Sequence, residues 1–431
     1  MTITDIRDVG SHVDQEVTVR GWIYNFRSSG KIHFVLVRDG SGVIQCIADA
    51  GNLSADGAAL VGTVTQESSV IVQGTIKQEP RAPGGYELHV SRIDAVQIAE
   101  NYPIAKKEHG VDFLLDHRHL WIRSPRQRAI LTVRDEVIWG LRKFFKEEGF
   151  RLTDTPILTP TSCEGTTTLF TTDYFGEPAY LSQSGQLYLE ALAMSLGKVY
   201  DFGPVFRAEK SKTRRHLTEF WMLDAEMAFT GHTESMAVQE KMLKYVIGHV
   251  LKTCAEELRI LERDVAKIQK LIAEPFVKMK YTQALEKLKS LGSDIRAGED
   301  FGNDDETLLM NHYEVPVFVT HYPVALKAFY MQPDEEDPSF ALCNDLLLPE
   351  GYGEVIGGSE RIHDLELLIQ RLREHGLPEK EFEWYLDLRR YGSVQHAGFG
   401  IGAERLVAYL CGLSHVRETI PFPRLLHRLR P

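Results

Sequence analysis

The sequence predicts an α+β protein in which a small N-terminal β-barrel precedes a larger domain built on an antiparallel β-sheet with flanking helices. Short strand patterns follow one another through residues 1–100 without a long amphipathic helix. From residue 126 onward, strands and helices are interleaved without the regular βαβ order of a parallel sheet. The length of 431 residues also exceeds that of one usual compact domain. We therefore expect domains over residues 1–100 and 126–431, joined by a hinge or linker over residues 101–125.

The N-terminal domain is predicted from its strand patterns. EVTVRGWIYNFR alternates in polarity, HFVLVRDGSGVIQCIAD gives two apolar runs around a DGSG turn, and SVIVQGTIKQEP and GYELHVSRIDAVQIAE follow. About five strands separated by turns in a segment of this length are typical of a small barrel. An OB-fold barrel is therefore the expected architecture.

The second domain is predicted to open with an amphipathic helix. The segment RQRAILTVRDEVIWGLRKFFKEEG places its apolar side chains on one helical face, and Gly149 ends the helix. The residues on that face are Ile130, Val133, Val137, Leu141 and Phe144.

Further helices and strands share the rest of this domain. We expect helices over residues 186–196, 363–376 and 403–411, and a largely helical stretch within about 230–310. The expected strands are VYDFGPVFRAE, EFWMLDAEMAF, VPVFVTHYP, ALKAFYMQP, FALCNDLLLP and GYGEVIGGSERI.

The composition argues against several classes of protein. No apolar run is long enough to cross a bilayer, and the first residues lack the basic start and apolar core of a secretory signal. The five cysteines form no CxxC pair, so we expect neither a zinc site nor a disulfide framework, and a cytoplasmic location fits. Neither a GxxxxGK[ST] loop nor a GxGxxG fingerprint is present. Taken alone, the net charge of −12 argues against nucleic-acid binding but allows a local basic surface, and no DNA partner is expected.

The stretch FRAEKSKTRRHLTEF (residues 206–220) concentrates positive charge in an acidic chain. We expect Arg207 and Glu209 to share one face of a strand, where an arginine binds phosphate or carboxylate and a carboxylate accepts from an amine. Phe220 begins the return strand and suits stacking on a flat ring. The loop between them carries mobile cations and a histidine: Lys210, Lys212, Arg214, Arg215 and His216. Taken alone, such a loop is more readily explained as a hairpin tip with solvated charges.

Two further stretches carry groups suited to anions and metal ions. In GFGIGAERL the glycines permit close backbone approach, and Arg405 follows at the start of a helix, where anions are favoured. In CNDLLLPEGYGEVIGGSER, Asp345 and Glu354 are nine residues apart on expected adjacent strands, and Arg361 follows a Gly-Gly-Ser turn. Two carboxylates near phosphate-binding arginines suit Mg²⁺. Singly, a helix cap and two surface acids would explain these residues as well.

A threonine- and glycine-rich loop and the helix after it complete the set. In TSCEGTTTLF, Glu164 is placed to receive an ammonium group. In SQSGQLYLE, Gln183 and Gln186 are polar residues at the mouth of an apolar helix that Ser184 caps. The simpler alternative is a loop followed by a capped helix.

In chain order, these motifs resemble those of a known family. GFRLTDTP (residues 149–156), FRAE with RRHLTEF, and GFGIGAERL near the C-terminus resemble motifs 1, 2 and 3 of the class II aminoacyl-tRNA synthetases. The N-terminal barrel places the resemblance in the subgroup for aspartate, asparagine and lysine, and the asparaginyl branch is the most similar. The likeness extends from about residue 10 to the terminal IPFPRLLHRLRP, which is nearly the whole chain.

The resemblance implies ATP-dependent ligation of L-asparagine to tRNA(Asn) through an asparaginyl-adenylate. Arg207 and Arg405 would be the catalytic residues, Arg207 at the α-phosphate and the amino-acid carboxylate, and Arg405 at the γ-phosphate. Glu209 would accept from the adenine amine, and Phe220 would stack on the ring. The other ATP-site residues would be Arg215 and His216 near the triphosphate, with Asp345 and Glu354 as the Mg²⁺ ligands.

The amino-acid contacts leave both asparagine and aspartate open. By the same resemblance, Glu164 would close over the substrate ammonium group with Gln186 beside it, and Arg361 would face the side chain. Leu189 stands where aspartyl enzymes usually have a lysine, and the loss of a cation favours an amide. Asp224 stands where asparaginyl enzymes commonly have glutamate and aspartyl enzymes have aspartate. An aspartyl-tRNA synthetase, including a non-discriminating one, is therefore the alternative.

The resemblance also implies macromolecular partners. Phe34 would stack on an anticodon base, with Arg27 and Gln45 contacting base edges. Pro156 would lie in the motif 1 interface of a homodimer. No membrane partner is expected. A tRNA-independent asparagine synthetase on the same catalytic domain is a further alternative, but such relatives typically lack the barrel predicted over residues 1–100.

Overall fold

The structure is a computed structural model that describes residues 2–105, 107–161, 169–210 and 213–431. The chain divides into two compact units, Met1–Gly110 and Val111–Pro431, and each is described by itself. A search of the described residues finds no helix long and apolar enough to span a membrane.

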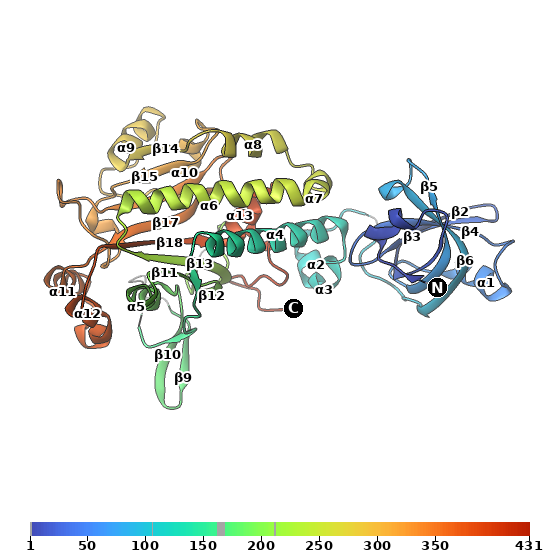
Figure 1. Cartoon of the computed structure of the whole chain (residues 1–431), viewed down its shortest axis with the longest axis horizontal. Coiled ribbons are helices and arrows are strands. Elements are labelled where there is room, and N and C mark those ends of the chain that lie inside the picture. Colours follow the sequence, from blue (N-terminus) through green and yellow to red (C-terminus); the bar gives the residue numbers. More distant parts are fainter. Residues whose placement is uncertain (1, 106, 162–168, 211–212) are drawn as a thin grey trace. The chain divides into compact units, whose positions relative to one another are not determined.

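The N-terminal unit is a closed β-barrel, as the strand patterns predict (Figure 1). Its sheet has the order β1-β2-β3-β4-β6-β5, and a further pairing of β2 with β5 closes the barrel. Alternate side chains fill the interior, among them Val17 and Val19 of β2 and Val35 and Val37 of β3. The strands are β1 (Thr2–Ile3), β2 (Glu16–Ser29), β3 (Ile32–Arg38), β4 (Val43–Asp49), β5 (Ser69–Gln78) and β6 (Tyr86–Gln97).

This unit also holds a helix that the sequence patterns do not predict. Helix α1 (Ala55–Thr63) follows β4, and the Ser54 hydroxyl caps it by accepting from the backbone N–H of Gly57 at 3.1 Å. Glycines at positions 57 and 62 lower its helical propensity, which explains why no helical pattern stands out. Two 3₁₀ turns, η1 (Ile6–His12) and η2 (Pro83–Gly85), complete the unit.

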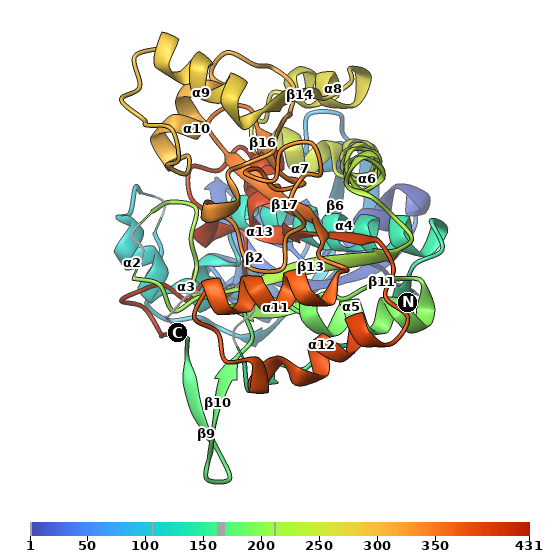
Figure 2. The ribbon, with the colours of Figure 1, turned by 90° about the vertical axis from the view of Figure 1, so that its left-hand side faces the viewer.

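The second unit is built on a mostly antiparallel sheet of order β14-β15-β16-β17-β18-β13-β11-β7, with β12 paired to β13. Only the β14–β15 and β11–β7 pairs are parallel. A smaller sheet has the order β8-β10-β9, and its β9–β10 hairpin projects from the unit (Figure 2). The strands are β7 (Arg151–Leu152), β8 (Leu158–Thr159), β9 (Thr171–Tyr174), β10 (Glu177–Leu181), β11 (Lys198–Tyr200), β12 (Gly203–Phe206), β13 (Glu219–Ala228), β14 (Val277–Lys280), β15 (Val317–Thr320), β16 (Cys343–Leu348), β17 (Gly353–Arg361) and β18 (His396–Gly402).

Helices α4, α6 and α13 pack on one face of this sheet and leave the opposite face for the predicted site. Their apolar side chains form the main core with Leu223 and Ala225 of β13 and Phe399 and Ile401 of β18. Because side chains alternate along a strand, the residues between these positions face the other way. The helices are α2 (Val111–Asp116), α3 (Arg118–Trp121), α4 (Pro125–Glu147), α5 (Gln186–Leu196), α6 (His232–Thr253), α7 (Ala255–Ile260), α8 (Val265–Ala273), α9 (Tyr281–Ser290), α10 (Asn303–Met310), α11 (Leu365–Glu374), α12 (Glu383–Arg390) and α13 (Ala403–Cys411), with the 3₁₀ turns η3 (Val324–Leu326), η4 (Glu379–Phe382) and η5 (Val416–Glu418).

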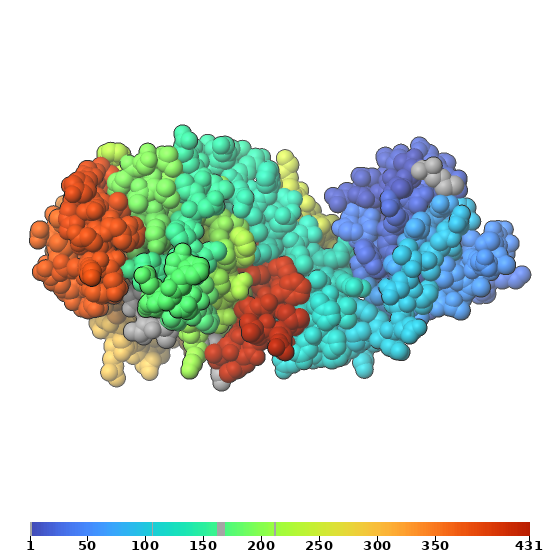
Figure 3. All heavy atoms as spheres, turned by 90° about the horizontal axis from the view of Figure 1, so that it is seen from below, coloured from blue at the N-terminus to red at the C-terminus, as the bar shows by residue number. Residues whose placement is uncertain are grey.

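The C-terminal residues lie at the surface of the second unit, where they are red in Figure 3. The backbone N–H of Thr218 donates to the carbonyl of Arg424 at 3.0 Å, so the chain end pairs with the segment that leads into β13. The last residues of the chain are thereby held beside the loop of predicted phosphate ligands.

Several predicted elements differ from the structure. GFGIG, for which no strand was expected, forms the strand β18, and the Gly-Gly-Ser before Arg361 lies within β17 rather than in a turn. ALKAFYMQP contains the turn η3 rather than a strand, since its backbone does not pair along its length. Strand β12 ends at Phe206, so Arg207 and Glu209 follow the strand instead of lying in it. Helices α2 and α3 occupy part of the predicted connector, and α12 was not predicted.

Candidate active site

A cavity of about 410 Å³ opens on the face of β13, β17 and β18 that lies opposite α4 and α6. Residues far apart in the sequence meet here. The predicted site residues that line it are Gln186, Arg207, Glu209, Arg215, His216, Phe220, Asp224, Asp345, Glu354, Arg361 and Arg405. Glu164 lies outside the described residues. The structure therefore brings the candidate residues of motifs 2 and 3, of CNDLLLPEGYGEVIGGSER and of SQSGQLYLE to one place.

The glycines of β18 make room for the acidic side chains of the neighbouring strand β13. Asp224 pairs with Gly400 and Glu226 with Gly398 across the two strands. A Cβ atom at Gly400 would collide with Asp224 Oδ1, and one at Gly398 would collide with the Glu226 carboxylate. The alternating glycines of GFGIG are thus explained by the carboxylates that lie over them.

Arg361, which lines the cavity, forms a buried ion pair that the sequence analysis did not identify. Arg361 donates to Glu226 from Nε at 3.1 Å and from Nη2 at 2.5 Å, and its Nη1 donates to Ser359 Oγ at 2.6 Å. Both charged side chains are almost completely buried. The acid that partners Arg361 is therefore Glu226.

The charge states of this pair follow from its surroundings. Burial and the nearby Glu190 and Asp224 carboxylates raise the pKa of Glu226, and the Arg361 guanidinium opposes that rise. A guanidinium keeps its proton at all ordinary pH values. Its hydrogen bonds to Glu226 favour the carboxylate form, so the pair is neutral as a whole.

Asp224 lines the cavity but is tied to the start of α5. Its Oδ2 accepts from Ser184 Oγ at 2.7 Å and from the backbone N–H of Gly185 at 3.0 Å. Asp201, which the sequence analysis did not identify, accepts from the backbone N–H of Asp224 at 3.2 Å and from Thr155 Oγ1 at 2.5 Å. Burial and the nearby Asp224 charge raise the pKa of Asp201 to about 7.

Leu189 is not among the residues that line the cavity. Its side chain is fully buried in a small apolar cluster with Ala193 and Val199. The Leu189 side chain therefore makes no direct contact in the cavity. The Glu226–Arg361 pair supplies a stronger physical basis for selecting an amide.

The cations of the motif 2 loop are more firmly held than the sequence predicts. Arg215 donates to Glu306 at 2.5 Å, to Thr307 Oγ1 at 2.9 Å and to the Gly351 carbonyl at 2.6 Å. It is a buried, fixed cation, and the expectation of a mobile one is wrong. Beside it, burial and the Arg405 charge lower the pKa of His216 to about 4. Lys212 lies outside the described residues.

Two carboxylates converge at the phosphate side of the cavity. A Cβ atom at Gly357 would lie 3.1 Å from Glu354 Oε1 and 3.9 Å from Asp345 Oδ1, so both oxygens border one small space. Arg405 donates to Glu354 Oε2 at 3.0 Å, and Lys327 donates to Asp345 Oδ2 at 2.9 Å. No group of three or more metal-ligating residues occurs in the described part of the chain. Two carboxylates fit Mg²⁺, which usually takes one or two from the protein and the rest from phosphates and water.

The predicted anticodon residues lie on one face of the barrel. Arg27 of β2 pairs with Phe34 of β3, and its guanidinium lies over the phenyl ring at 4.4 Å from the centroid. Gln45 of β4 donates to Glu87 at 2.6 Å. Phe34 and Gln45 are half-buried, so part of each remains open to a ligand.

The comparisons with known proteins agree with this geometry. The family described as tRNA synthetases class II (D, K and N) matches residues 110–426, and the OB-fold nucleic acid binding domain matches residues 17–96. The chain is 55% identical to an asparagine--tRNA ligase of Pelotomaculum thermopropionicum over 99% of each chain, and 54% identical to one of Desulforamulus reducens, again over 99% of each.

Solved structures of aminoacyl-tRNA synthetases are also similar to this chain. Asparaginyl-tRNA synthetase from Pyrococcus horikoshii complexed with asparaginyl-adenylate has a TM-score of 0.96 and 40% identity, with 99% of each chain covered. A putative aspartyl-tRNA synthetase from Leishmania major has a TM-score of 0.85 and 25% identity, with 100% of this chain and 95% of that one covered. The chain belongs to the class II aminoacyl-tRNA synthetases, in the group for aspartate, lysine and asparagine. Within that group it belongs to the asparaginyl-tRNA synthetase family.

Proposed function

We propose that this chain ligates L-asparagine to tRNA(Asn) in two steps. The amino-acid carboxylate attacks the α-phosphorus of ATP, and pyrophosphate leaves. The terminal ribose hydroxyl of the tRNA then attacks the asparaginyl-adenylate, and AMP is released. The first step needs no base, because the attacking carboxylate is already ionised and the developing charge lies on phosphate oxygens that cations stabilise. In the second step the hydroxyl proton passes to the phosphate of the leaving AMP.

The observation that carries the choice of asparagine is the buried Glu226–Arg361 pair. Because Glu226 already neutralises Arg361, the side-chain pocket offers no net positive charge to a carboxylate. A neutral amide avoids the cost of burying an uncompensated charge. An amide also has an oxygen that accepts from the guanidinium and an NH₂ group that donates to an acid.

ATP would occupy the opposite side of the cavity. Arg207 would bind the α-phosphate together with the amino-acid carboxylate, and Arg405 would bind the γ-phosphate. Glu209 would accept from the adenine amine, while Phe220 and Arg405 would lie on the two faces of the ring. Arg215 and His216 would lie near the triphosphate. The low pKa of His216 makes its ring neutral at physiological pH, so it would act as a hydrogen-bonding group rather than as a cation.

Asp345 and Glu354 would hold Mg²⁺ at the phosphates. The ion would supply positive charge to the phosphate oxygens during the transfer. To do so, these acids would exchange their present partners Lys327 and Arg405 for the metal, and both freed cations would then face the polyphosphate.

The amino-acid ammonium group would be received by Gln186 and Asp224, with Glu164 closing over it. Asp224 is held by Ser184 and Gly185, which orients its carboxylate within the cavity. In this arrangement Asp224 serves the ammonium group, whereas Glu226 serves the side chain.

The barrel would read the anticodon, and the second unit would dimerise. Phe34 would stack on an unpaired base, with Arg27 and Gln45 at base edges. Pro156 is exposed in the same short segment as the exposed apolar residues Ile157 and Leu158, which suits a surface covered by a second copy. A cytoplasmic location completes the proposal.

ATP–pyrophosphate exchange with purified protein tests the amino-acid choice directly. Asparagine and aspartate are compared at equal concentrations. Exchange with asparagine alone is expected. Exchange with aspartate would instead assign the chain to aspartyl activation and remove the argument from the Glu226–Arg361 pair.

A further inference from the structure

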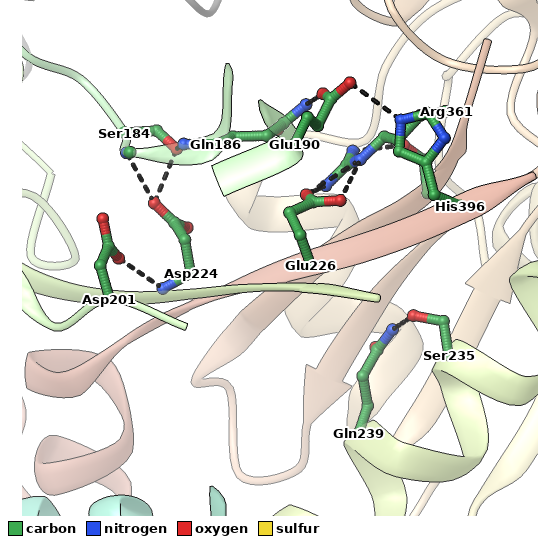
Figure 4. A network of polar contacts seen from close by, with 12 residues as sticks. Ser184, Gln186, Glu190, Asp201, Asp224, Glu226, Ser235, Gln239, Arg361 and His396 are labelled. Carbon is green, nitrogen blue, oxygen red and sulfur yellow. Dashed lines mark hydrogen bonds and ion pairs between the residues drawn. The ribbon is translucent and has the colours of Figure 1, made fainter. Parts of the chain in front are cut away.

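A buried carboxylate next to the cavity is surrounded by hydrogen-bond donors. Glu190 is fully buried on α5, one turn after Gln186. Its Oε1 faces Gln186 Nε2 at 3.2 Å and the Tyr385 hydroxyl at 2.8 Å. Its Oε2 faces Arg389 Nη2 at 2.7 Å and His396 Nε2 at 3.0 Å. Figure 4 shows the Gln186 side chain running to Glu190, with His396 beyond it.

This environment keeps Glu190 ionised. Burial acts to raise its pKa, but the Arg389 charge and the contact with His396 outweigh burial and hold the pKa below its usual range. An ionised carboxylate can only accept hydrogen bonds. It therefore takes the NH₂ end of the Gln186 amide.

The orientation of Gln186 matters because this residue lines the cavity. With its NH₂ group directed at Glu190, the amide leaves its carbonyl oxygen for the substrate. An ammonium group has three donors and no acceptor, so it needs that carbonyl end. In the opposite orientation, the Gln186 NH₂ group would face the substrate ammonium group, and two donors cannot form a hydrogen bond.

We propose that Glu190 is a positioning residue for the amino-acid ammonium group, because it holds the Gln186 amide with the carbonyl oxygen toward the substrate. The inference rests on the proposed function, in which Gln186 contacts that ammonium group. Glu190 does not line the cavity and acts only through Gln186.

The variant Glu190→Gln has a defined consequence. The carbonyl oxygen of the new amide must stay against Arg389, because a guanidinium cannot accept a hydrogen bond. The NH₂ group of the new amide then faces Gln186. Gln186 turns its own carbonyl toward that NH₂ group and presents its own NH₂ group to the cavity.

The test measures ATP–pyrophosphate exchange with two probes. One is asparagine, through its KM. The other is succinamate, which is asparagine without the amino group, through its Ki as a competitor. For Glu190→Gln we expect the asparagine KM to rise about tenfold, because one charge-assisted hydrogen bond to the ammonium group is lost. The succinamate Ki should stay unchanged, because succinamate has no ammonium group. A parallel rise of both constants would indicate a merely structural role and overturn the proposal, as would an unchanged KM.

A reciprocal exchange of the two side chains provides rescue. In Gln186→Glu/Glu190→Gln, the carboxylate at position 186 again offers an acceptor to the cavity, so the asparagine KM should return toward that of the wild type. Gln186→Glu alone places two carboxylates side by side, so its asparagine KM should stay above that of the wild type. A folded double variant without recovery would contradict the proposal. The matched control is Tyr385→Phe, which removes a donor to Glu190 but keeps its contact with Gln186, and an unchanged KM is expected.

Two further arrangements keep the test decisive. If Glu190→Gln does not fold, because Arg389 has lost its counter-charge, Glu190→Asp keeps that ion pair and withdraws the carboxylate from Gln186. The asparagine KM should then rise by about threefold with the succinamate Ki unchanged. If the wild type activates aspartate rather than asparagine, the proposed function fails, but the inference is tested equally with aspartate and succinate.

Discussion

Glu226 reaches Arg361 across the strand that separates them. Glu226 lies on β13 and Arg361 on β17, with β18 between, and the carboxylate passes over Gly398 to accept hydrogen bonds from the guanidinium. The pair therefore depends on three strands at once. The first prediction follows from the neutrality of this pair.

The first outcome concerns amino-acid selection. Glu226→Gln leaves the Arg361 charge uncompensated, so the pocket becomes more favourable to a carboxylate. We expect the ratio of kcat/KM for asparagine over aspartate to fall by at least about tenfold, in line with the cost of leaving a buried charge unpaired. Exchange kinetics with both amino acids measure this ratio. The matched control is Glu360→Gln on β17, next to Arg361, where the carboxylate instead accepts from the backbone N–H of His232. A ratio that stays at the wild-type value in Glu226→Gln would contradict the selection argument.

The second outcome concerns adenylate formation. Arg207→Ala removes a cation from the site where negative charge develops, and loss of one such group typically costs about 10²–10³ in rate. We expect exchange to fall by this factor while circular dichroism stays unchanged. Arg259→Ala, on an exposed residue paired with Glu256, provides the control with full activity. Wild-type exchange in Arg207→Ala would refute the assignment of the motif 2 arginine.

The third outcome separates the two units. Phe34→Ala should leave pyrophosphate exchange unchanged and weaken tRNA charging by about five- to one-hundred-fold, since stacking on a base contributes about 1–3 kcal/mol. Phe26 lies on the neighbouring strand next to Arg27 and is exposed, so Phe26→Ala is an aromatic control on the same barrel. Equal losses of exchange and charging in Phe34→Ala would contradict the division of roles between barrel and catalytic unit.

The fourth outcome is a pH dependence of stability. Burial lowers the pKa of His232 to about 4, and the neighbouring His321 adds to this effect. In the unfolded chain the histidine titrates near its usual value of about 6.5, so between these values the unfolded state binds more protons. The stabilising contribution of neutral His232 is therefore complete above about pH 6.5 and is lost as the pH falls toward 4.

Urea unfolding at pH 7.5 and pH 5 measures this contribution. Between these two conditions, wild-type protein should lose about 2 kcal/mol more free energy of unfolding than His232→Gln, which cannot titrate. The Asn344 amide, 3.2 Å from the His232 ring, remains as a hydrogen-bond partner for glutamine. The same pH dependence in both proteins would show that His232 does not carry the effect.

The sequence predicted the motif residues better than the packing between them. Arg207, Phe220 and Arg405 were identified because each lies in a short local pattern, and the structure gathers them around one cavity. Glu226 was missed because its partner Arg361 is far along the chain, and only the register of three strands brings them together.

Local patterns also misjudged residues whose surroundings are built by distant segments. The sequence predicts that Arg215 is a solvated cation in a loop, yet Glu306 of the separate helix α10 binds it. For Gly398 and Gly400 the sequence indicates a close backbone approach but not its partner, because the carboxylates that fill the space above them belong to another strand. Leu189 was expected to matter through a missing charge, but its side chain packs in an apolar cluster outside the cavity.

The strand β18 has a consequence for how such a pocket can change over generations. Its glycines give the substrate face no side chains of their own, and a single methyl group at position 398 or 400 would displace a carboxylate. Side chains at these two positions are therefore costly, and selection has little room to vary them one at a time. Changes in amino-acid preference are more readily reached on the flanking strands, which already carry the side chains of the pocket.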